Sequence, residues 1–327
     1  MLTGSVWKTI NVLKARRGAT NGTAGAMAVS KPSGQHWSNI LIAEGHGIQI
    51  ESANSSQDHI WFLETAYKRE INARQACSIE STCRHNEETT VHLLSTGNIS
   101  SSTCRYINVL SKYPNFRSSA LNVTAELAET PLALLVAEGG RQRRSPYAVA
   151  HLSDFLRYIV LWKRGGAYLD SDIIMMKSLK GIRNSAFYQS SRDEASVANG
   201  MLFFDKHHPV LVELIDRCAR TYDPDTWTTC GPKLMSQLPS DSEYSSRINF
   251  LNQSEFFGVP WKIWNDLFIP AKAPAALSAV NDSLGVHFWN KLSEKRRVVP
   301  GSGSAIDILA RTHCPEVYRI SRSMSAF

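Results

Sequence analysis

The sequence contains no uninterrupted stretch of about eighteen apolar residues, the length that a helix needs to cross a lipid bilayer. Residues 1–57 also lack the apolar core of a signal peptide, because Lys, Arg, Gly, Asn and Ser interrupt them throughout. We expect this segment to be weakly structured and to hold no membrane anchor. Residues 58–327 are long and apolar enough to bury a large core, so we expect them to form one domain.

Several common catalytic patterns are also missing. No G-x-G-x-x-G follows the first expected strand, which argues against a nicotinamide enzyme, and no Walker loop, H-E-x-x-H or G-x-S-x-G is present. The net charge of +7 is spread along the chain rather than gathered with aromatic residues, so we expect no nucleic acid partner. The cluster at residues 141–144 lies just before the central helix and could meet a diphosphate or an anionic membrane surface.

The cysteines do not have the close paired spacing of a zinc site. Their even number is compatible with disulfides, although free buried thiols are the alternative; they are Cys77, Cys83, Cys104, Cys218, Cys230 and Cys314. The chain also has glycosylation sequons at Asn21, Asn54, Asn98, Asn122, Asn252 and Asn281. Both features favour a secretory lumen, so we expect several disulfides, whose pairing cannot be deduced from the sequence.

The most informative stretch spans residues 153–179. Apolar residues recur every three or four positions from Leu152 to Trp162, which predicts a helix with Ser153 as its cap. Gly165 and Gly166 are expected to end the helix, because the residue just past a helix often needs a left-handed conformation. The following residues predict a buried strand, interrupted by Asp170 and Asp172 and continued by the apolar run 173–176.

In an extended chain the two aspartates lie on the same side, with Cα atoms roughly 6.5–7 Å apart, so they can bind one divalent cation. Asp154 and Arg157 share a face of the preceding helix, and the Gly-Gly turn would fold that face towards them. Asp154 can accept hydrogen bonds from sugar hydroxyls, and Arg157 can donate to sugar or phosphate oxygens. With a cation to neutralise a diphosphate leaving group, these four catalytic candidates are typical of a nucleotide-sugar glycosyltransferase.

A bare Asp-x-Asp match means little, since thirteen aspartates predict about 0.5 such pairs by chance. A second pair, Asp223 and Asp225, has no strand before it, and we predict that it forms a turn. Two aspartates this close in sequence do not supply the facing acids of a glycoside hydrolase. A non-catalytic protein that binds sugars or nucleotides remains an alternative.

Strands and helices are expected to alternate, which predicts an α/β fold. The expected elements are strands at 60–65, 91–94, 201–204 and 286–289, a helix at 73–81 capped by Asn72, one within 112–137, one from Pro209 and a short one near 229–232. The aromatic residues Trp261, Trp264 and Phe268 fit core packing better than stacking on a sugar.

Seven stretches, in order, resemble the α1,4-glycosyltransferase family of the lactosylceramide 4-α-galactosyltransferase and α1,4-N-acetylglucosaminyltransferase type, particularly its arthropod members. They are residues 60–65, 74–81, 153–179, 199–205, 231–232, 286–291 and 310–318. The resemblance implies a GT-A type fold with a single Rossmann-like mixed sheet flanked by helices. It also implies a UDP-sugar donor, Mn²⁺ as cofactor, and retention of the anomeric configuration.

The same resemblance assigns further residues. His287 would join Asp170 and Asp172 as a metal ligand, although a lone histidine is usually structural. The donor site would comprise Phe62, Leu63, Glu64, Asp154, Arg157, Tyr168, Asn199, Gly200 and Trp289, with core packing the alternative for Phe62 and Leu63 and a plain strand start the alternative for Gly200. Many relatives have a polar pair where this chain has Thr229 and Cys230, which leaves any contact there open.

The expected reaction moves galactose or N-acetylgalactosamine from UDP to a galactose-type acceptor on a glycolipid. The alternative is transfer of N-acetylglucosamine to a glycoprotein glycan. Family members normally carry an N-terminal anchor that places the catalytic domain in the Golgi lumen. We therefore expect membrane association in a longer form of this chain.

Overall fold

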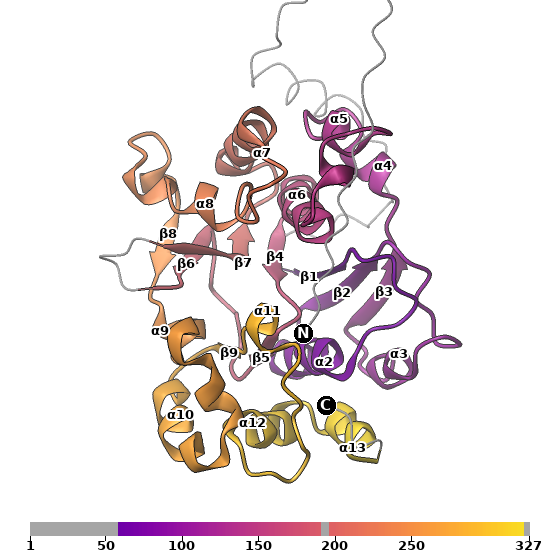
Figure 1. The fold of residues 1–327 in the computed structure, drawn as a ribbon, viewed down its shortest axis with the longest axis vertical. Helices are drawn as coiled ribbons and strands as arrows, with labels where there is room; N and C mark the ends of the chain where they lie inside the picture. The colour runs from indigo at the N-terminus through magenta and orange to yellow at the C-terminus, as the bar shows by residue number, and fades with distance from the viewer. Residues whose placement is uncertain (1–57, 191–195, 324–327) are drawn as a thin grey trace, which may run out of the picture.

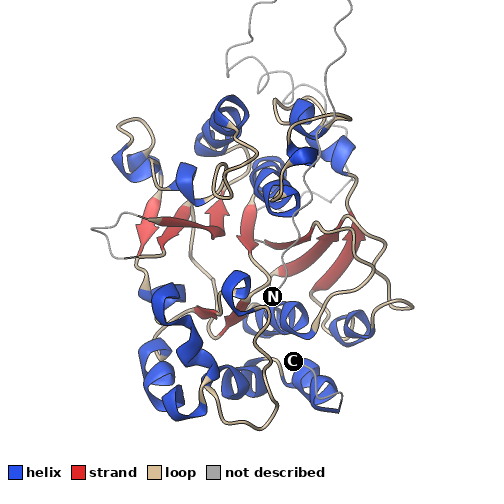
Figure 2. Cartoon of the chain, viewed as in Figure 1, coloured by secondary structure: helices blue, strands red, loops and turns tan. Residues whose placement is uncertain are grey.

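The computed structural model describes residues 58–190 and 196–323, and its centre is a seven-stranded mixed β-sheet with helices on both faces (Figure 1; Figure 2). The strand order is β3-β2-β1-β4-β7-β6-β8. The strands are β1 (His59–Glu64), β2 (Thr90–Ser95), β3 (Phe116–Ala120), β4 (Gly166–Leu169), β6 (Ser185–Tyr188), β7 (Val197–Phe204) and β8 (Asn249–Leu251). This architecture confirms the prediction of an α/β fold built on one main mixed sheet.

Helices cover the sheet from two sides (Figure 1). One side carries α4 (Val123–Leu127), α5 (Ala133–Val136), α6 (Ala148–Arg164), α7 (Pro209–Thr221) and α8 (Pro232–Met235). The other carries α2 (Ala73–His85), α3 (Arg105–Leu110), α10 (Ala273–Val280), α12 (Ala305–His313) and α13 (Pro315–Ser323). Shorter elements are α9 (Ser254–Phe257), α11 (Asn290–Ser293) and the 3-10 helices at Gln142–Arg144, Leu238–Ser240, Ser245–Arg247, Trp261–Phe268 (η5) and Pro270–Lys272.

The side chains of β1 alternate between two buried cores. Ile60 and Phe62 pack in the core that contains α2, whereas Trp61 and Leu63 pack in the core that contains α6. Strands β3, β2, β1 and β4 are parallel, and β7 is antiparallel to its neighbours β4 and β6. Because both faces of the sheet are covered, its central strands are continuous apolar runs rather than alternating ones.

The central helix, α6, starts earlier than the sequence predicted. It begins at Ala148 with Tyr147 as its N-cap, so the assignment of Ser153 as the cap is wrong. It ends at Gly165, as predicted, and the indole N–H of Trp61 donates a hydrogen bond of 2.8 Å to the Gly165 carbonyl. Gly166 has a φ of 99°, and a Cβ there would lie 2.3 Å from the His59 carbonyl oxygen, so only glycine lets β4 start this close to β1.

The chain does not form one strand through the two aspartates, and that expectation is corrected. The N–H of Asp170 makes the last bond to β7, donating to the Gly200 carbonyl at 2.7 Å, and the chain then turns at residues 171–172. The apolar run that follows is β5 (Ile173–Met175), which pairs with β9 (Gly285–His287) in a separate antiparallel sheet.

Most other predicted elements are confirmed, with shifted ends, but residues 112–137, where one helix was expected, form the strand β3 and the two short helices α4 and α5. Helix α2 starts at Ala73 with the predicted cap, Asn72, in a capping box, and it continues to His85. The strand expected at 201–204 begins at Val197, so Gly200 lies inside β7 and does not start it. The second Asp-x-Asp pair lies in a turn after α7, as predicted.

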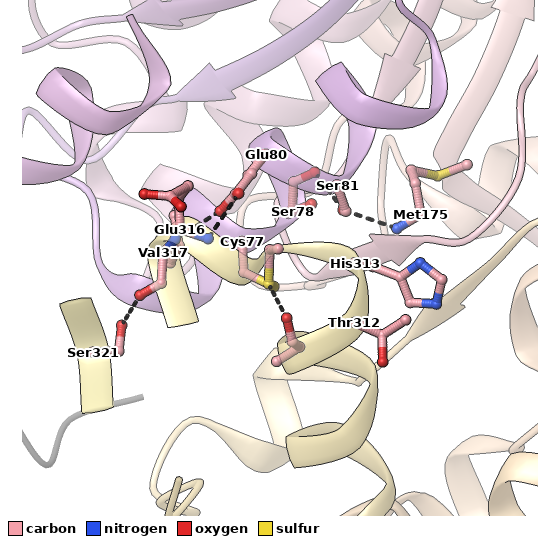
Figure 3. Close-up of a disulfide and its surroundings, with 12 residues drawn as sticks. Cys77, Ser78, Glu80, Ser81, Met175, Thr312, His313, Glu316, Val317 and Ser321 are labelled. Atoms are coloured by element: carbon pink, nitrogen blue, oxygen red, sulfur yellow. Dashed lines mark hydrogen bonds between the residues drawn. A yellow bond between two sulfur atoms is a disulfide. The ribbon is translucent and has the colours of Figure 1, made fainter. Parts of the chain in front are cut away.

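Two disulfides, Cys77–Cys314 and Cys218–Cys230, confirm that several cysteines are paired, whereas Cys83 and Cys104 are buried free thiols. The first disulfide joins α2 to the residue before α13, across 237 positions of sequence. Beside it the Glu80 carboxylate accepts hydrogen bonds from the N–H groups of Glu316 and Val317, at 3.0 and 2.7 Å (Figure 3). A side chain of α2 therefore caps the first turn of α13.

Within the described residues, no helix has both the length and the apolar character that a bilayer crossing requires. The expectation for residues 1–57, and the sequons at Asn21 and Asn54, lie outside the described residues. The four sequon asparagines that are described are all exposed and accessible to glycosylation: Asn98, Asn122, Asn252 and Asn281.

We expect Glu80→Gln to destabilise the protein by about 1–3 kcal/mol, because an amide NH₂ cannot accept a hydrogen bond from the buried N–H groups of α13. Thermal unfolding followed by circular dichroism measures this as a lower Tm. Glu88→Gln is the matched control, since Glu88 pairs with Lys180 at 3.0 Å on the surface, where both side chains are mostly exposed. Equal shifts in the two variants would contradict the capping role.

The disulfide assignment predicts the outcome of thiol labelling. Alkylation of the unfolded, unreduced chain should modify only Cys83 and Cys104, and all six cysteines should react after reduction. Peptide mapping by mass spectrometry identifies the labelled positions. Labelling of Cys77 or Cys314 without reductant would show that the link between α2 and α13 is absent.

Candidate active site

A pocket of about 840 Å³ opens where α6, the end of β4, β7 and the segment after β9 meet. Its size is within the range of small-molecule sites in proteins. Its lining contains most of the site residues expected from the sequence, namely Asp154, Arg157, Asp170, Asp172, Asn199, Gly200, His287 and Trp289. The fold therefore brings together residues from three distant parts of the chain.

Arg157 links the two sides of the pocket. Its guanidinium lies 3.2 Å from Asp154 Oδ1 on the same helix and 3.3 Å from Asp170 Oδ1 at the end of β4. It also donates a 2.6 Å hydrogen bond to the Asn199 carbonyl in β7 and stacks on the Tyr168 ring, 4.4 Å from its centroid. Burial opposes the charge, but the surrounding groups, Tyr168 and the two aspartates, raise the pKa of Arg157, so it stays protonated.

Asp154 is buried and is held through one of its two oxygens. Its Oδ1 accepts a 2.7 Å hydrogen bond from the Asn199 side-chain amide and faces Arg157. Burial raises the pKa of Asp154 to about 6, although Arg157 and Asn199 favour its charged form. The second oxygen, Oδ2, accepts no bond from the described residues and lies where a Cβ on Gly231 would be 3.0 Å away. It is therefore available to a ligand.

Asp170 is held in the same way. The Tyr168 hydroxyl donates a 2.6 Å hydrogen bond to Asp170 Oδ1, the oxygen that also faces Arg157. The other oxygen, Oδ2, lies against Gly200, where an added Cβ would be only 2.6 Å away. Glycine in β7 therefore makes room for the carboxylate itself, which was neither of the two explanations that the sequence suggested for it.

Asp172 is fixed by the segment that follows β9. His287 Nε2 lies 3.2 Å from Asp172 Oδ1, and the N–H of Asn290 donates to Oδ2 at 2.8 Å. Burial opposes ionisation of both side chains, but their mutual attraction lowers the pKa of Asp172 and raises the pKa of His287. Trp289 adopts a left-handed conformation with a φ of 55°, which turns the chain so that the Asn290 N–H reaches the carboxylate.

Asp170, Asp172 and His287 form the one group of three potential metal ligands found among the described residues, with ligand atoms within 4.8 Å of one another. Two carboxylates and an imidazole suit a divalent cation such as Mn²⁺. The Trp289 N–H donates to His287 Nδ1 at 3.2 Å, so Nε2 carries the ring proton here. Nε2 would bind a cation only as the unprotonated nitrogen of a neutral imidazole.

Some expected donor-site residues do not line the pocket. Phe62 and Leu63 lie in the two cores, and Glu64 accepts hydrogen bonds from the Ala66 N–H and the Gln75 side chain. The next residue, Thr65, does line the pocket. A nucleotide-binding role for residues 62–64 therefore stays a prediction.

The arginine cluster at residues 141–144 is absent from the pocket lining. Arg141 donates to the Tyr222 carbonyl, and Arg143 donates to the Val136 carbonyl. Of the three aromatic residues expected to pack in the core, Trp264 packs edge-on against Phe268, whereas Trp261 lines the pocket.

Sequence reasoning missed several residues at the site. Ser153 accepts a 3.0 Å hydrogen bond from Arg157 Nη2, and its spacing of four from Arg157 on a helix was the available signal. Asn290 acts through its backbone, which no side-chain pattern reveals, although it lies in the matched stretch 286–291. Trp227 lines the pocket from the turn after α7, and no motif marked it.

Two family models match the chain. The model described as "Alpha 1,4-glycosyltransferase conserved region" matches residues 203–321, which include His287. The model described as "Glycosyltransferase sugar-binding region containing DXD motif" matches residues 72–191, which include Asp170 and Asp172. The first region thus contains the histidine, and the second the two aspartates, of the group of potential metal ligands.

Named relatives match most of the chain. Human lactosylceramide 4-alpha-galactosyltransferase is 30% identical over 277 residues, spanning 80% of this chain and 76% of that protein. Its mouse counterpart is 29% identical over 279 residues, with 81% and 76% covered. Human alpha-1,4-N-acetylglucosaminyltransferase is 28% identical over 289 residues, with 83% and 82% covered.

Similar solved structures are more distant. The PaToxG glycosyltransferase has a TM-score of 0.44 and 15% identity, with 82% of this chain and 87% of that chain covered. The galactosyltransferase LgtC, in complex with donor and acceptor sugar analogs, has a TM-score of 0.41 and 14% identity, with 71% and 87% covered.

We expect Gly200→Ala to displace Asp170 and to destabilise the fold by about 1–3 kcal/mol, because the new methyl group overlaps the carboxylate. In an Asp170→Ala background the same change should cost much less, since the overlapping atoms are gone. Urea unfolding of the four proteins in this double-mutant cycle measures the coupling. Equal costs in both backgrounds would mean that Gly200 serves only the strand.

Proposed function

The chain belongs to the α1,4-glycosyltransferase family, and from this premise we propose that it transfers galactose or N-acetylgalactosamine from a UDP-sugar to a galactose-type hydroxyl on a glycolipid. The observation that carries the proposal is the convergence of Asp154, Arg157, Asp170, Asp172 and His287 on one pocket. The human and mouse relatives named for lactosylceramide support the glycolipid acceptor.

In this proposal Asp170, Asp172 and His287 hold a divalent cation, with Mn²⁺ as the candidate. When bound, the cation neutralises charge on the diphosphate leaving group as a Lewis acid. Arg157 fixes the Asp170 carboxylate through their 3.3 Å ion pair, and Asn290 fixes Asp172. The carboxylates are thus held in place before a cation binds, which lowers the entropic cost of binding it.

Asp154 positions the transferred sugar. With a pKa of about 6, its carboxyl group is mostly ionised at neutral pH, and the unpaired Oδ2 can accept a hydrogen bond from a sugar hydroxyl. Gly231 keeps this oxygen accessible, because any larger residue would approach both Asp154 and Asn199. Asn199, Gly200, Tyr168 and Trp289 complete the proposed donor site, with Tyr168 acting through Asp170.

The proposed chemistry retains the anomeric configuration. Among the described lining residues, the carboxylates are those of Asp154, Asp170 and Asp172, and each already has a holding or positioning role. The acceptor hydroxyl would therefore attack the anomeric carbon on the face from which UDP departs. The bond from that carbon to the diphosphate oxygen breaks, and the hydroxyl proton passes to a phosphate oxygen of the leaving UDP.

We also propose that the enzyme works in the Golgi lumen, associated with the membrane. The two disulfides and the four exposed sequons support an oxidising, glycosylating compartment. The N-acetylglucosaminyltransferase relative covers a similar share of the chain at 28% identity, so transfer of N-acetylglucosamine to glycoprotein glycans is the second candidate. A panel of UDP-sugars with lactosylceramide, lactose and a glycoprotein glycan, assayed with and without Mn²⁺, separates the two.

Both Asp172→Ala and Asp172→Asn should abolish transfer without unfolding the chain, because they remove a charged ligand rather than core volume. Asn is nearly isosteric with Asp, so its failure would identify charge as the property required. Asp223→Asn and Asp225→Asn are matched controls in the second Asp-x-Asp pair and should remain close to full activity. UDP release and sugar transfer are measured at saturating Mn²⁺, and full activity of Asp172→Asn or of the parent in EDTA would refute metal dependence.

Asp154→Asn should reduce kcat less severely than the changes at Asp172. Losing one charged hydrogen bond costs about 1.5–3 kcal/mol, or roughly ten- to a hundredfold in rate. Steady-state kinetics of sugar transfer at saturating donor measures the effect. Complete inactivity with an unchanged Tm would instead place Asp154 in the chemical step.

A further inference from the structure

The opening of the catalytic pocket is apolar on its exposed side. Eight large apolar side chains are exposed among the described residues, and four of them line this pocket: Val149, Trp227, Trp261 and Leu292. Their exposed fractions lie between 44% and 51%. Single exposed apolar residues are ordinary, but a group around one opening indicates a binding surface.

These four residues come from separate segments that meet at the opening. Val149 lies at the start of α6, Trp227 in the turn after α7, Trp261 at the start of η5, and Leu292 in α11. A packed core does not explain them, because each exposes close to half of its surface. We call this group, with the adjacent Lys262 and Lys291, the apolar rim.

The charged residues of the apolar rim, Lys262 and Lys291, are both basic. The exposed residues that line the pocket are Pro146, Val149, Trp227, Trp261, Lys291 and Leu292, and none of them is acidic. Each exposed tryptophan has a lysine ammonium near its ring, with Lys291 Nζ 5.8 Å from the Trp227 centroid and Lys262 Nζ 5.8 Å from that of Trp261. Exposed acidic residues flank two rim segments in sequence, Asp225 before Trp227 and Glu294 after Leu292, but neither lines the pocket, and the Asp223 carboxylate is bonded to its own turn.

A second pocket lies at the opposite ends of β4 and β7. Its exposed lining differs from the apolar and basic lining of the first pocket's opening. That pocket, of about 400 Å³, has exposed lining residues of both charges, including Arg84, Glu87, Glu88 and Lys180. Four of its charged side chains form ion pairs, Lys180 with Glu88 at 3.0 Å and Arg183 with Asp205 at 2.8 Å. It has the mixed polar character of an ordinary protein surface.

We propose that the apolar rim docks on a lipid bilayer, so that the pocket receives its acceptor sugar from a glycolipid that stays in the membrane. Tryptophan prefers the headgroup level of a bilayer, and lysine reaches lipid phosphates while its stem covers apolar surface. A soluble glycan would need hydrogen-bonding partners at the opening, and the exposed lining offers few. The acceptor part of this inference rests on the proposed function, whereas the docking itself does not.

The docking test measures binding without any reaction. The full chain is co-sedimented with phosphatidylcholine vesicles that contain no glycolipid, so that the net charge of +7 cannot drive the binding. The double variant Trp227→Ser/Trp261→Ser should bind at least about tenfold more weakly, since it loses two large interfacial side chains. The control is Leu134→Ser, which removes an 81% exposed leucine outside both pockets and should bind like the parent.

The docking proposal is overturned if the parent does not bind these vesicles, or if the double variant binds as well as the parent. It is also overturned if the parent is a dimer that the double variant dissociates, because a second copy would then cover the apolar rim. Sedimentation velocity distinguishes that case.

Activity provides an independent readout. Turnover of lactosylceramide in vesicles should fall about tenfold more than turnover of free lactose in the double variant, because only the embedded acceptor needs docking. An equal fall on both acceptors would assign the tryptophans to sugar stacking and overturn the bilayer role. If neither acceptor reacts with any UDP-sugar while vesicle binding persists, the proposed function fails and the membrane surface stands.

Discussion

The buried charge of Arg157 determines how the pocket is built. An arginine residue that is only 5% exposed needs charged partners, and the Arg157 guanidinium faces one oxygen of each of two aspartates. Asp154 and Asp170 both line the pocket and are each held through Oδ1, while Oδ2 of each lies next to a glycine. The Arg157 side chain thus fixes α6, the end of β4 and β7 relative to one another. The Oδ2 atoms of the two aspartates remain as oriented hydrogen-bond acceptors. Moving α6 or the end of β4 would separate Arg157 from one of its aspartates, and moving β7 would take the Asn199 carbonyl away from the guanidinium.

Local features of this arrangement could be predicted because they depend on neighbours in sequence. The N-cap at Asn72, the stop at Gly165 and the shared helix face of Asp154 and Arg157 each involve residues at most a few positions apart. The start of α6 was misplaced because Ser153 is a good capping residue that serves a different partner, Arg157. Capping propensity shows which hydrogen bonds a side chain can make, but the tertiary contacts determine which of them forms.

Contacts that join distant parts of the chain could not be predicted in the same way. Nothing near Glu80 in sequence shows that its carboxylate caps a helix at Glu316, or that Cys77 pairs with Cys314. The role of Gly200 was also hidden, because the atom that needs its space belongs to Asp170. Asn290 contributes only its backbone N–H, which every residue except proline has. The resemblance to a family located such stretches without giving their contacts.

The small β5–β9 sheet explains why His287 meets Asp172 at all. Ile173 pairs with His287, and the N–H of Phe288 donates to the Asp172 carbonyl at 3.0 Å, so the ladder fixes the histidine beside the turn that carries the aspartate. A register shift of one residue would turn every side chain of β9 to the opposite face. It would bury the imidazole and present Val286 or Phe288 to the pocket. The core contacts of Val286 and Phe288, both buried, oppose that shift. Packing on one face of a three-residue strand therefore places His287, the third candidate metal ligand, on the other face.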